Sequence, residues 1–143
     1  MSFYTAINCM DGRVQLPVIN YLTARFKVDH IDSVTEARPV LYLAEKINSE
    51  QTKSILRRTD ISINNHKSTG IAVIAHHDCA GNPTDEQRQI SQLVPDVNFL
   101  ADRYPSKEII GLWGRFEPVG KRNLFNFKNI AARQIVAEVK SGM

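Results

Sequence analysis

An unbroken apolar run at residues 71–75, Ile-Ala-Val-Ile-Ala, constrains the fold most strongly. A short run with apolar side chains on both faces is typical of a strand that is buried on both sides. Such strands occur in the middle of parallel sheets that are covered by helices. The run therefore predicts a central strand of an α/β fold.

Strand-like and helix-like segments alternate along the chain, which is the order that a parallel sheet requires. Further strands are expected at residues 3–8, 28–34 and 108–113. Helical spacing of apolar side chains predicts helices over residues 14–27, 49–67, 84–104 and 124–139. Residues 40–47 fit either structure. The predicted fold is a single three-layer α/β domain, 1–143, with a central, mostly parallel four-stranded sheet and helices on both faces.

Local signals mark where two of these helices begin or bend. Ser49 is suited to be the N-cap of the helix that follows it. Thr84 and Gln87 have the spacing of a capping box, which predicts a helix start at Thr84. Pro95 lies inside the same helix and is expected to kink or split it, because proline has no amide hydrogen.

The composition is typical of a soluble globular protein, with 43% hydrophobic and 23% charged residues. The formal net charge is +3, but the basic residues are scattered among acidic ones and form no cluster suited to nucleic acid. No segment resembles a membrane span or a signal peptide. We therefore expect a cytoplasmic protein without a nucleic-acid or membrane partner, in which cysteines bind metal or react rather than form disulfides.

Both cysteines of the chain lie in short motifs that directly follow predicted strands. The motifs are Cys9-Met10-Asp11-Gly12-Arg13 and His76-His77-Asp78-Cys79. Two thiolates and the His76 imidazole are three ligands for zinc, with a fourth position left for water. Open α/β sheets bind ligands at strand ends where the strand order reverses. If the two strands are neighbours at that point, Cys9, His76 and Cys79 converge.

The residue types alone leave other roles open for these cysteines. Free cysteines are often small buried side chains of a core. The residue types and their spacing therefore favour simple burial and a shared metal site equally. A thiol-redox pair is the weakest alternative, because Cys9 and Cys79 do not form a Cys-x-x-Cys motif. Redox chemistry would also leave the rest of both motifs without a role.

Taken together, Cys9-x-Asp11-x-Arg13 and His76-x-x-Cys79-x-Gly81 resemble the zinc signature of β-class carbonic anhydrases. The resemblance extends more weakly over residues 70–81 and 111–120, which are similar to that family's central strand with its ligand loop and to its last strand with the following turn. It implies a β-carbonic anhydrase-like fold, usually dimeric, with Zn²⁺ held by Cys9, His76 and Cys79.

The resemblance also implies an activity. The family hydrates carbon dioxide to bicarbonate by a metal-bound hydroxide, so the chain is expected to be a zinc lyase (carbonate dehydratase) that acts on a small molecule as a homodimer or higher homo-oligomer. In that family the aspartate accepts a hydrogen bond from the zinc-bound water or hydroxide, and the arginine holds the aspartate in place; these residues are Asp11 and Arg13 here. In a closed resting state of some members, the aspartate leaves the arginine and becomes the fourth zinc ligand.

The chain departs from the family pattern in two places near the site. The Arg-Asn-Ala-Gly-like segment that helps to shape the family's pocket corresponds to residues 34–39, which do not match it. Ala80 stands where a glycine usually follows the second ligand cysteine. These differences leave two alternatives open: a zinc hydrolase of a related small substrate, carbon disulfide or carbonyl sulfide, and a non-catalytic zinc-binding homologue.

Overall fold

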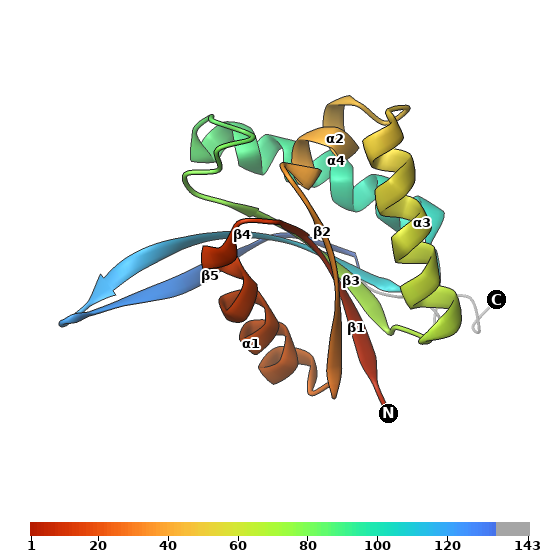
Figure 1. Cartoon of the computed structure of the whole chain (residues 1–143), viewed down its shortest axis with the longest axis horizontal. Helices are drawn as coiled ribbons and strands as arrows, with labels where there is room; N and C mark the ends of the chain where they lie inside the picture. The colour runs from red at the N-terminus through yellow and green to blue at the C-terminus, as the bar shows by residue number, and fades with distance from the viewer. Residues whose placement is uncertain (134–143) are drawn as a thin grey trace.

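The computed structural model describes residues 1–133, which are built around a five-stranded sheet with the order β2-β1-β3-β4-β5 (Figure 1). The parallel strands are β1 (Phe3–Cys9), β2 (His30–Glu36), β3 (Gly70–His76) and β4 (Glu108–Val119). The remaining strand, β5 (Arg122–Arg133), runs antiparallel to β4. Every residue of β3 is buried, as predicted for a central strand that is covered on both sides.

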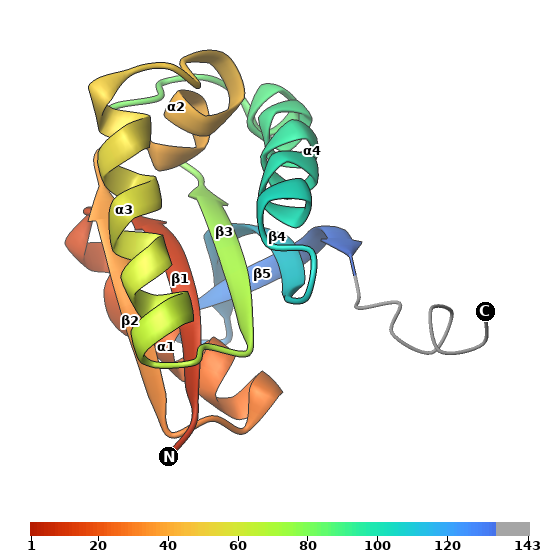
Figure 2. The same ribbon diagram turned by 90° about the vertical axis from the view of Figure 1, so that its right-hand side faces the viewer.

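Helices cover both faces of the sheet (Figures 1 and 2). One face carries α1 (Gln15–Phe26), which follows a short 3-10 turn, η1 (Gly12–Val14). The other face carries α2 (Pro39–Glu45), α3 (Glu50–Asn65) and α4 (Glu86–Arg103). The predicted three-layer α/β fold with a mostly parallel sheet is confirmed, and the segment that fitted either structure forms α2. The prediction of four strands is wrong, because β5 adds a fifth, antiparallel strand at the edge. Within residues 1–133, no helix has the length and apolar character needed to cross a membrane.

Each face of the sheet has its own apolar core. On the α1 side, Leu22 packs in one cluster with Tyr4 of β1. On the opposite side, Ile55 of α3 and Leu100 of α4 pack in a second cluster with Ile7 of β1. Full burial of one such aliphatic side chain contributes about 1.5–3 kcal/mol. The two cores hold the strands from both sides and so fix where the strand ends lie.

The strand order reverses between β1 and β3. The chain runs from β1 to β2 at one edge of the sheet and then crosses to the other side of β1 to form β3. Cys9 is the last residue of β1, and His76 is the last residue of β3. Because these neighbouring strands are parallel, their carboxyl ends meet at the same edge of the sheet. The adjacency on which the predicted metal site depends is therefore present.

The start of α3 agrees with the prediction, whereas the start of α4 differs from it. The Ser49 hydroxyl accepts a hydrogen bond from the Thr52 amide and caps α3. The predicted start of α4 at Thr84 is wrong by one residue. Asp85 is the N-cap instead, and its carboxylate accepts a hydrogen bond from the Arg88 amide at 2.8 Å. A carboxylate also interacts favourably with the positive end of the helix dipole.

Pro95 lies inside α4 without splitting it. The side chains of Leu93 and Val97, on either side of the proline, are buried in the core. We attribute the continuity of the helix to this packing, which offsets the hydrogen bond that proline removes.

The prediction of a C-terminal helix over residues 124–139 is wrong for residues 124–133, because these residues belong to β5. Phe125 and Phe127, two positions apart, both pack against the core on the α1 side. Gly120, with a φ of 64°, forms the tight turn that lets β5 fold back along β4. The strand period and this turn outweigh the helical spacing of the same segment. Residues 134–139 of the predicted helix lie outside the described residues.

Asp96 is a carboxylic acid enclosed in the core. Its exposed fraction is 0%, and neither carboxylate oxygen has a hydrogen-bond partner among the described residues. Burial raises the pKa of Asp96 to about 9, because removal from water disfavours the charged form. The folded protein therefore holds this side chain as a neutral acid at neutral pH.

Replacing Asp96 with leucine, which has a similar shape, should stabilise the fold and make its stability less dependent on pH. The unfolded chain releases the Asp96 proton above about pH 4. The folded chain keeps that proton until about pH 9, so wild-type stability falls as the pH rises between these values. Urea unfolding should show a gain for Asp96→Leu of roughly 1–3 kcal/mol at about pH 8, and a smaller gain at about pH 5.

Asp96→Asn is the matched control, because it is neutral at every pH but still polar. It should flatten the pH dependence as leucine does, with a smaller gain in the free energy of unfolding. Equal pH slopes for the wild type and both variants would contradict the assignment of Asp96 as a buried neutral acid.

Candidate metal centre

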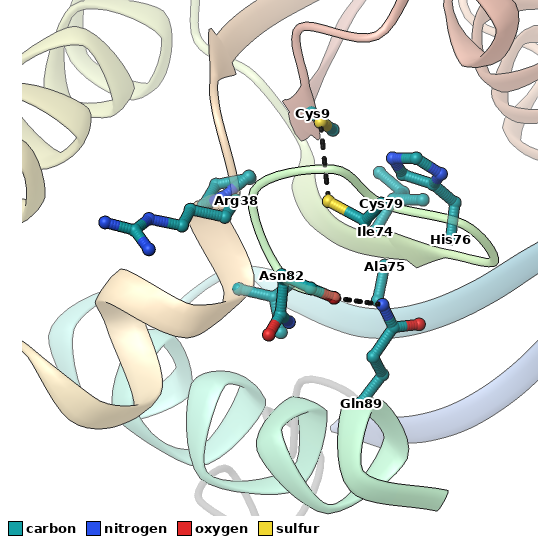
Figure 3. Close-up of a pocket in the computed structure, with 10 residues that line it drawn as sticks. Cys9, Arg38, Ile74, Ala75, His76, Cys79, Asn82 and Gln89 are labelled. Carbon is teal, nitrogen blue, oxygen red and sulfur yellow. Dashed lines mark hydrogen bonds between the residues drawn. The ribbon is translucent and has the colours of Figure 1, made fainter. Parts of the chain in front are cut away.

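Cys9, His76 and Cys79 meet at the carboxyl edge of the sheet (Figure 3). Cys9 ends β1, His76 ends the neighbouring β3, and Cys79 lies in the loop that follows β3. One potential ligand atom from each side chain lies within 4.8 Å of the others, and the two sulfur atoms are 3.9 Å apart. All three side chains are buried. The fold thus brings together the three residues that the sequence singled out.

The loop after β3 turns back so that Cys79 faces Cys9. Asp78 adopts a left-handed backbone conformation, with a φ of 60°, which changes the direction of the chain. At the start of the loop, the His77 amide donates a hydrogen bond to the Gly114 carbonyl of β4 at 2.9 Å. At its end, the Asn82 amide donates to the Cys79 carbonyl at 3.1 Å. These bonds tie the loop to the sheet and to itself.

His76 presents its Nε2 atom toward the two sulfurs in a form suited to metal binding. The Nδ1 atom lies 2.8 Å from the His77 carbonyl oxygen. Because a carbonyl can only accept, Nδ1 carries the hydrogen, and in the neutral ring Nε2 has the lone pair that a metal would bind. Nε2 is buried and has no hydrogen-bond partner in the described part of the chain. Burial alone would lower the pKa of His76, but Cys9 and the His77 carbonyl outweigh burial and raise it.

The two thiols are placed to share one proton. The hydrogen bond from Cys79 lowers the pKa of Cys9 well below its usual range, with further support from His76. The same bond, followed by burial, raises the pKa of Cys79. Both cysteines are free thiols. A divalent cation would displace the shared proton and favour both sulfurs as thiolates.

The donor set fits zinc. Zinc prefers sulfur and nitrogen ligands in tetrahedral geometry, and zinc–sulfur bonds of about 2.3 Å place two thiolates about 3.8 Å apart. The observed separation of the two sulfur atoms is 3.9 Å. The buried lone pair of His76 supplies a third donor on the same side. Three protein ligands leave one position free, which is the arrangement of a catalytic site.

Asp11 and Arg13 form a close ion pair next to these residues. Arg13 Nη2 donates to Asp11 Oδ2 at 2.6 Å, and the Arg13 amide donates to Asp11 Oδ1 at 2.9 Å. The hydrogen bonds from Arg13 lower the pKa of Asp11 to about 2, so this carboxyl is ionised at neutral pH.

Arg13 also connects the first motif to the second. Its Nη1 atom donates to the Asp78 carboxylate at 3.2 Å, and Nη2 donates to the Asp78 carbonyl at 3.1 Å. One guanidinium therefore orients Asp11 and supports the loop that carries Cys79.

Two further residues belong to the centre and were not recognised in the sequence. Gln15 Nε2 donates to the carbonyls of Cys9 and Asp11, at 2.7 and 2.9 Å. Arg38 Nη1 donates to the Gly81 carbonyl in the ligand loop at 3.3 Å. The position of Arg38 just after a predicted strand was an available signal, since that strand ends at the same edge of the sheet.

Small cavities adjoin the ligand residues. A cavity of about 90 Å³ lies against His76 and is also lined by Arg13, His77 and Arg115. A second, of about 10 Å³, is lined by Cys9 and other residues that Figure 3 draws. The larger cavity has room for water or for one small substrate molecule.

Comparison with known proteins agrees with this site. Residues 1–117 match a protein family described as "Putative carbonic anhydrase". The matched region contains both cysteine motifs, helices α1 to α4 and most of β4. No curated protein matches the chain. Since the match covers more than half of the 143 residues, the chain belongs to this carbonic anhydrase family.

Proposed function

We propose that the protein hydrates carbon dioxide to bicarbonate, with a zinc ion held by Cys9, His76 and Cys79. The observation that carries the proposal is the meeting of two distant motifs at one edge of the sheet. There the three potential ligands adjoin the ion pair of Asp11 and Arg13. Membership of the carbonic anhydrase family supports the same activity.

The reaction needs a nucleophilic oxygen at neutral pH and a means of aiming it. When bound, zinc would lower the pKa of water toward neutrality and supply hydroxide for attack on the carbon of carbon dioxide. Cys9 and Cys79 would bring two negative charges to the centre and so offset the charge of the ion. We therefore expect ionisation of the water to occur later than at a site built from three histidines, with activity rising above neutral pH.

Asp11 would orient the attacking oxygen. An ionised carboxylate can accept the remaining hydrogen of that oxygen and leave a lone pair directed at the substrate carbon. Arg13 binds both oxygens of Asp11, and this fixes the plane of the carboxylate. In the closed state of some β-class enzymes, the corresponding aspartate becomes a fourth ligand of the zinc. The ion pair with Arg13 would keep Asp11 from doing so.

We further propose that the chain acts as a single-domain, cytoplasmic enzyme and assembles as a homodimer or higher homo-oligomer. The two apolar cores share one sheet, which supports a single domain. Leu16 is 68% exposed and adjoins a groove between α1 and the β4–β5 hairpin, which offers apolar surface to another copy.

Stopped-flow hydration of carbon dioxide tests the activity. Purified protein should carry about one zinc ion per chain. Its hydration rate should be low at neutral pH and should rise toward about pH 9, and chelation of the zinc should abolish it. Zinc-loaded protein without activity over this range would overturn the proposed reaction. Protein that binds no stoichiometric zinc would overturn the metal site as well.

Replacing Asp11 with alanine separates its positioning of the nucleophile from metal binding. The hydration rate constant kcat should fall by roughly 100-fold or more, while zinc content stays at about one per chain. Asp29→Ala is a matched control, because Asp29 also accepts a backbone amide bond, from Ser2, outside both motifs. It should leave kcat unchanged. Loss of zinc from the Asp11 variant would show instead that Asp11 serves as a ligand.

A further inference from the structure

We propose that Arg38 is a positioning residue of the metal centre, which holds the loop carrying Cys79 at the correct distance from Cys9. This inference rests on the proposed metal site. Arg38 is not a candidate ligand and lies outside both cysteine motifs, but it contacts the elements that carry the two sulfurs.

The backbone of Arg38 adjoins Cys9. Arg38 follows β2 and precedes α2, with φ and ψ both at 51°. This left-handed conformation is uncommon for a residue other than glycine and is energetically unfavourable. The amide of Arg38 hydrogen-bonds the Cys9 sulfur, and both residues line the same small cavity as Cys79. A costly conformation that serves a site of this kind is typical of a functional constraint.

The guanidinium of Arg38 binds the ligand loop. Nη1 donates a hydrogen bond to the Gly81 carbonyl at 3.3 Å, and Nη2 donates to the Tyr42 hydroxyl at 3.3 Å. The guanidinium carbon also lies 5.0 Å from the centre of the Tyr42 ring, in cation–π contact. Tyr42 belongs to α2, so the side chain is held from the helix while it binds the loop.

The aliphatic part of Arg38 packs directly on Gly81. A Cβ atom added at Gly81 would lie 3.2 Å from Arg38 Cβ and 3.4 Å from its Cγ and Cδ atoms. This separation is tight for carbon atoms, which leaves little room for any side chain at position 81. Gly81 follows Cys79 by two residues in the same loop. Arg38 is therefore in contact with the loop segment that carries the second sulfur.

These contacts place Arg38 between the two proposed sulfur ligands, Cys9 at the end of β1 and Cys79 in the loop after β3. Cys9 is fixed by the sheet, whereas Cys79 depends on a loop without regular structure. Arg13 holds this loop at the Asp78 carbonyl, and Arg38 holds it at the Gly81 carbonyl. Removing a contact that orients metal ligands typically weakens metal affinity by roughly 10–100-fold.

Titration with Co²⁺ tests the role of Arg38. Thiolate-bound Co²⁺ absorbs in the ultraviolet, and its visible bands report the ligand geometry, so binding and geometry are read without an activity assay. Arg38→Ala should bind Co²⁺ roughly 10–100-fold more weakly than the wild type, with shifted visible bands. The melting temperature of the metal-free protein should change little.

Arg103→Ala is the matched control for a lost arginine. Arg103 lies 5.6 Å from the ring centre of Tyr104 and donates to its hydroxyl at 3.1 Å, as Arg38 does to Tyr42, but it is remote from the centre. Its Co²⁺ affinity and spectrum should match the wild type. Gly81→Ala is an independent test that keeps the guanidinium and crowds its aliphatic part; it should also weaken Co²⁺ binding.

The outcomes distinguish this inference from the proposed function. Wild-type affinity and spectrum in both Arg38→Ala and Gly81→Ala would overturn the role of Arg38 alone. Equal weakening by Arg103→Ala would also overturn it, because the effect would then be a general loosening of the fold. If Arg38→Ala does not fold, the Co²⁺ affinity and spectrum of Gly81→Ala decide whether Arg38 positions the loop. A wild type that binds no Co²⁺ would overturn the metal site and this inference together.

Discussion

Backbone hydrogen bonds between β1 and β3 set the distance between the two cysteine motifs. Their parallel register pairs Thr5 with Ile71 and Ile7 with Val73, so the two strands end within about one residue of each other in the sheet. A slip of one residue would turn Cys9 to the opposite face and separate it from His76. The apolar cores on both faces oppose such a slip, because it would also expose buried side chains. The chemistry of the site thus depends on the packing of the whole sheet.

The remaining ligand depends on side chains rather than on the sheet. Cys79 lies in a loop whose carbonyls accept hydrogen bonds from Arg13 and Arg38, two residues from separate elements. The long side chain of an arginine lets its guanidinium bind carbonyls that lie far from its own backbone, and the guanidinium stays charged at physiological pH. The same Arg13 also orients Asp11. Electrostatics and loop geometry at this edge of the sheet are therefore coupled through a few guanidinium groups.

Much of the fold and of the candidate site follows from local patterns. The apolar run at residues 71–75 predicted the central strand, and the position of both motifs at strand ends predicted that Cys9, His76 and Cys79 meet. The C-terminal segment was assigned to a helix because its apolar spacing fits both a helix and a strand. The turn at Gly120 and the pairing with β4 favour the strand. The contacts of Arg38 depend on a left-handed backbone and on a loop from elsewhere in the chain, which no local pattern encodes.

The antiparallel strand β5 changes what the sheet can do at its margins. Without it, β4 would present a row of unpaired amides and carbonyls in a largely buried, apolar sequence, which is a template for adding a foreign strand. With β5 in place, the outermost strands are β2 and β5, which carry Asp32, Glu36 and Lys128. Charged side chains discourage edge-to-edge pairing. These charged edges therefore disfavour the continuous growth of one sheet into the next.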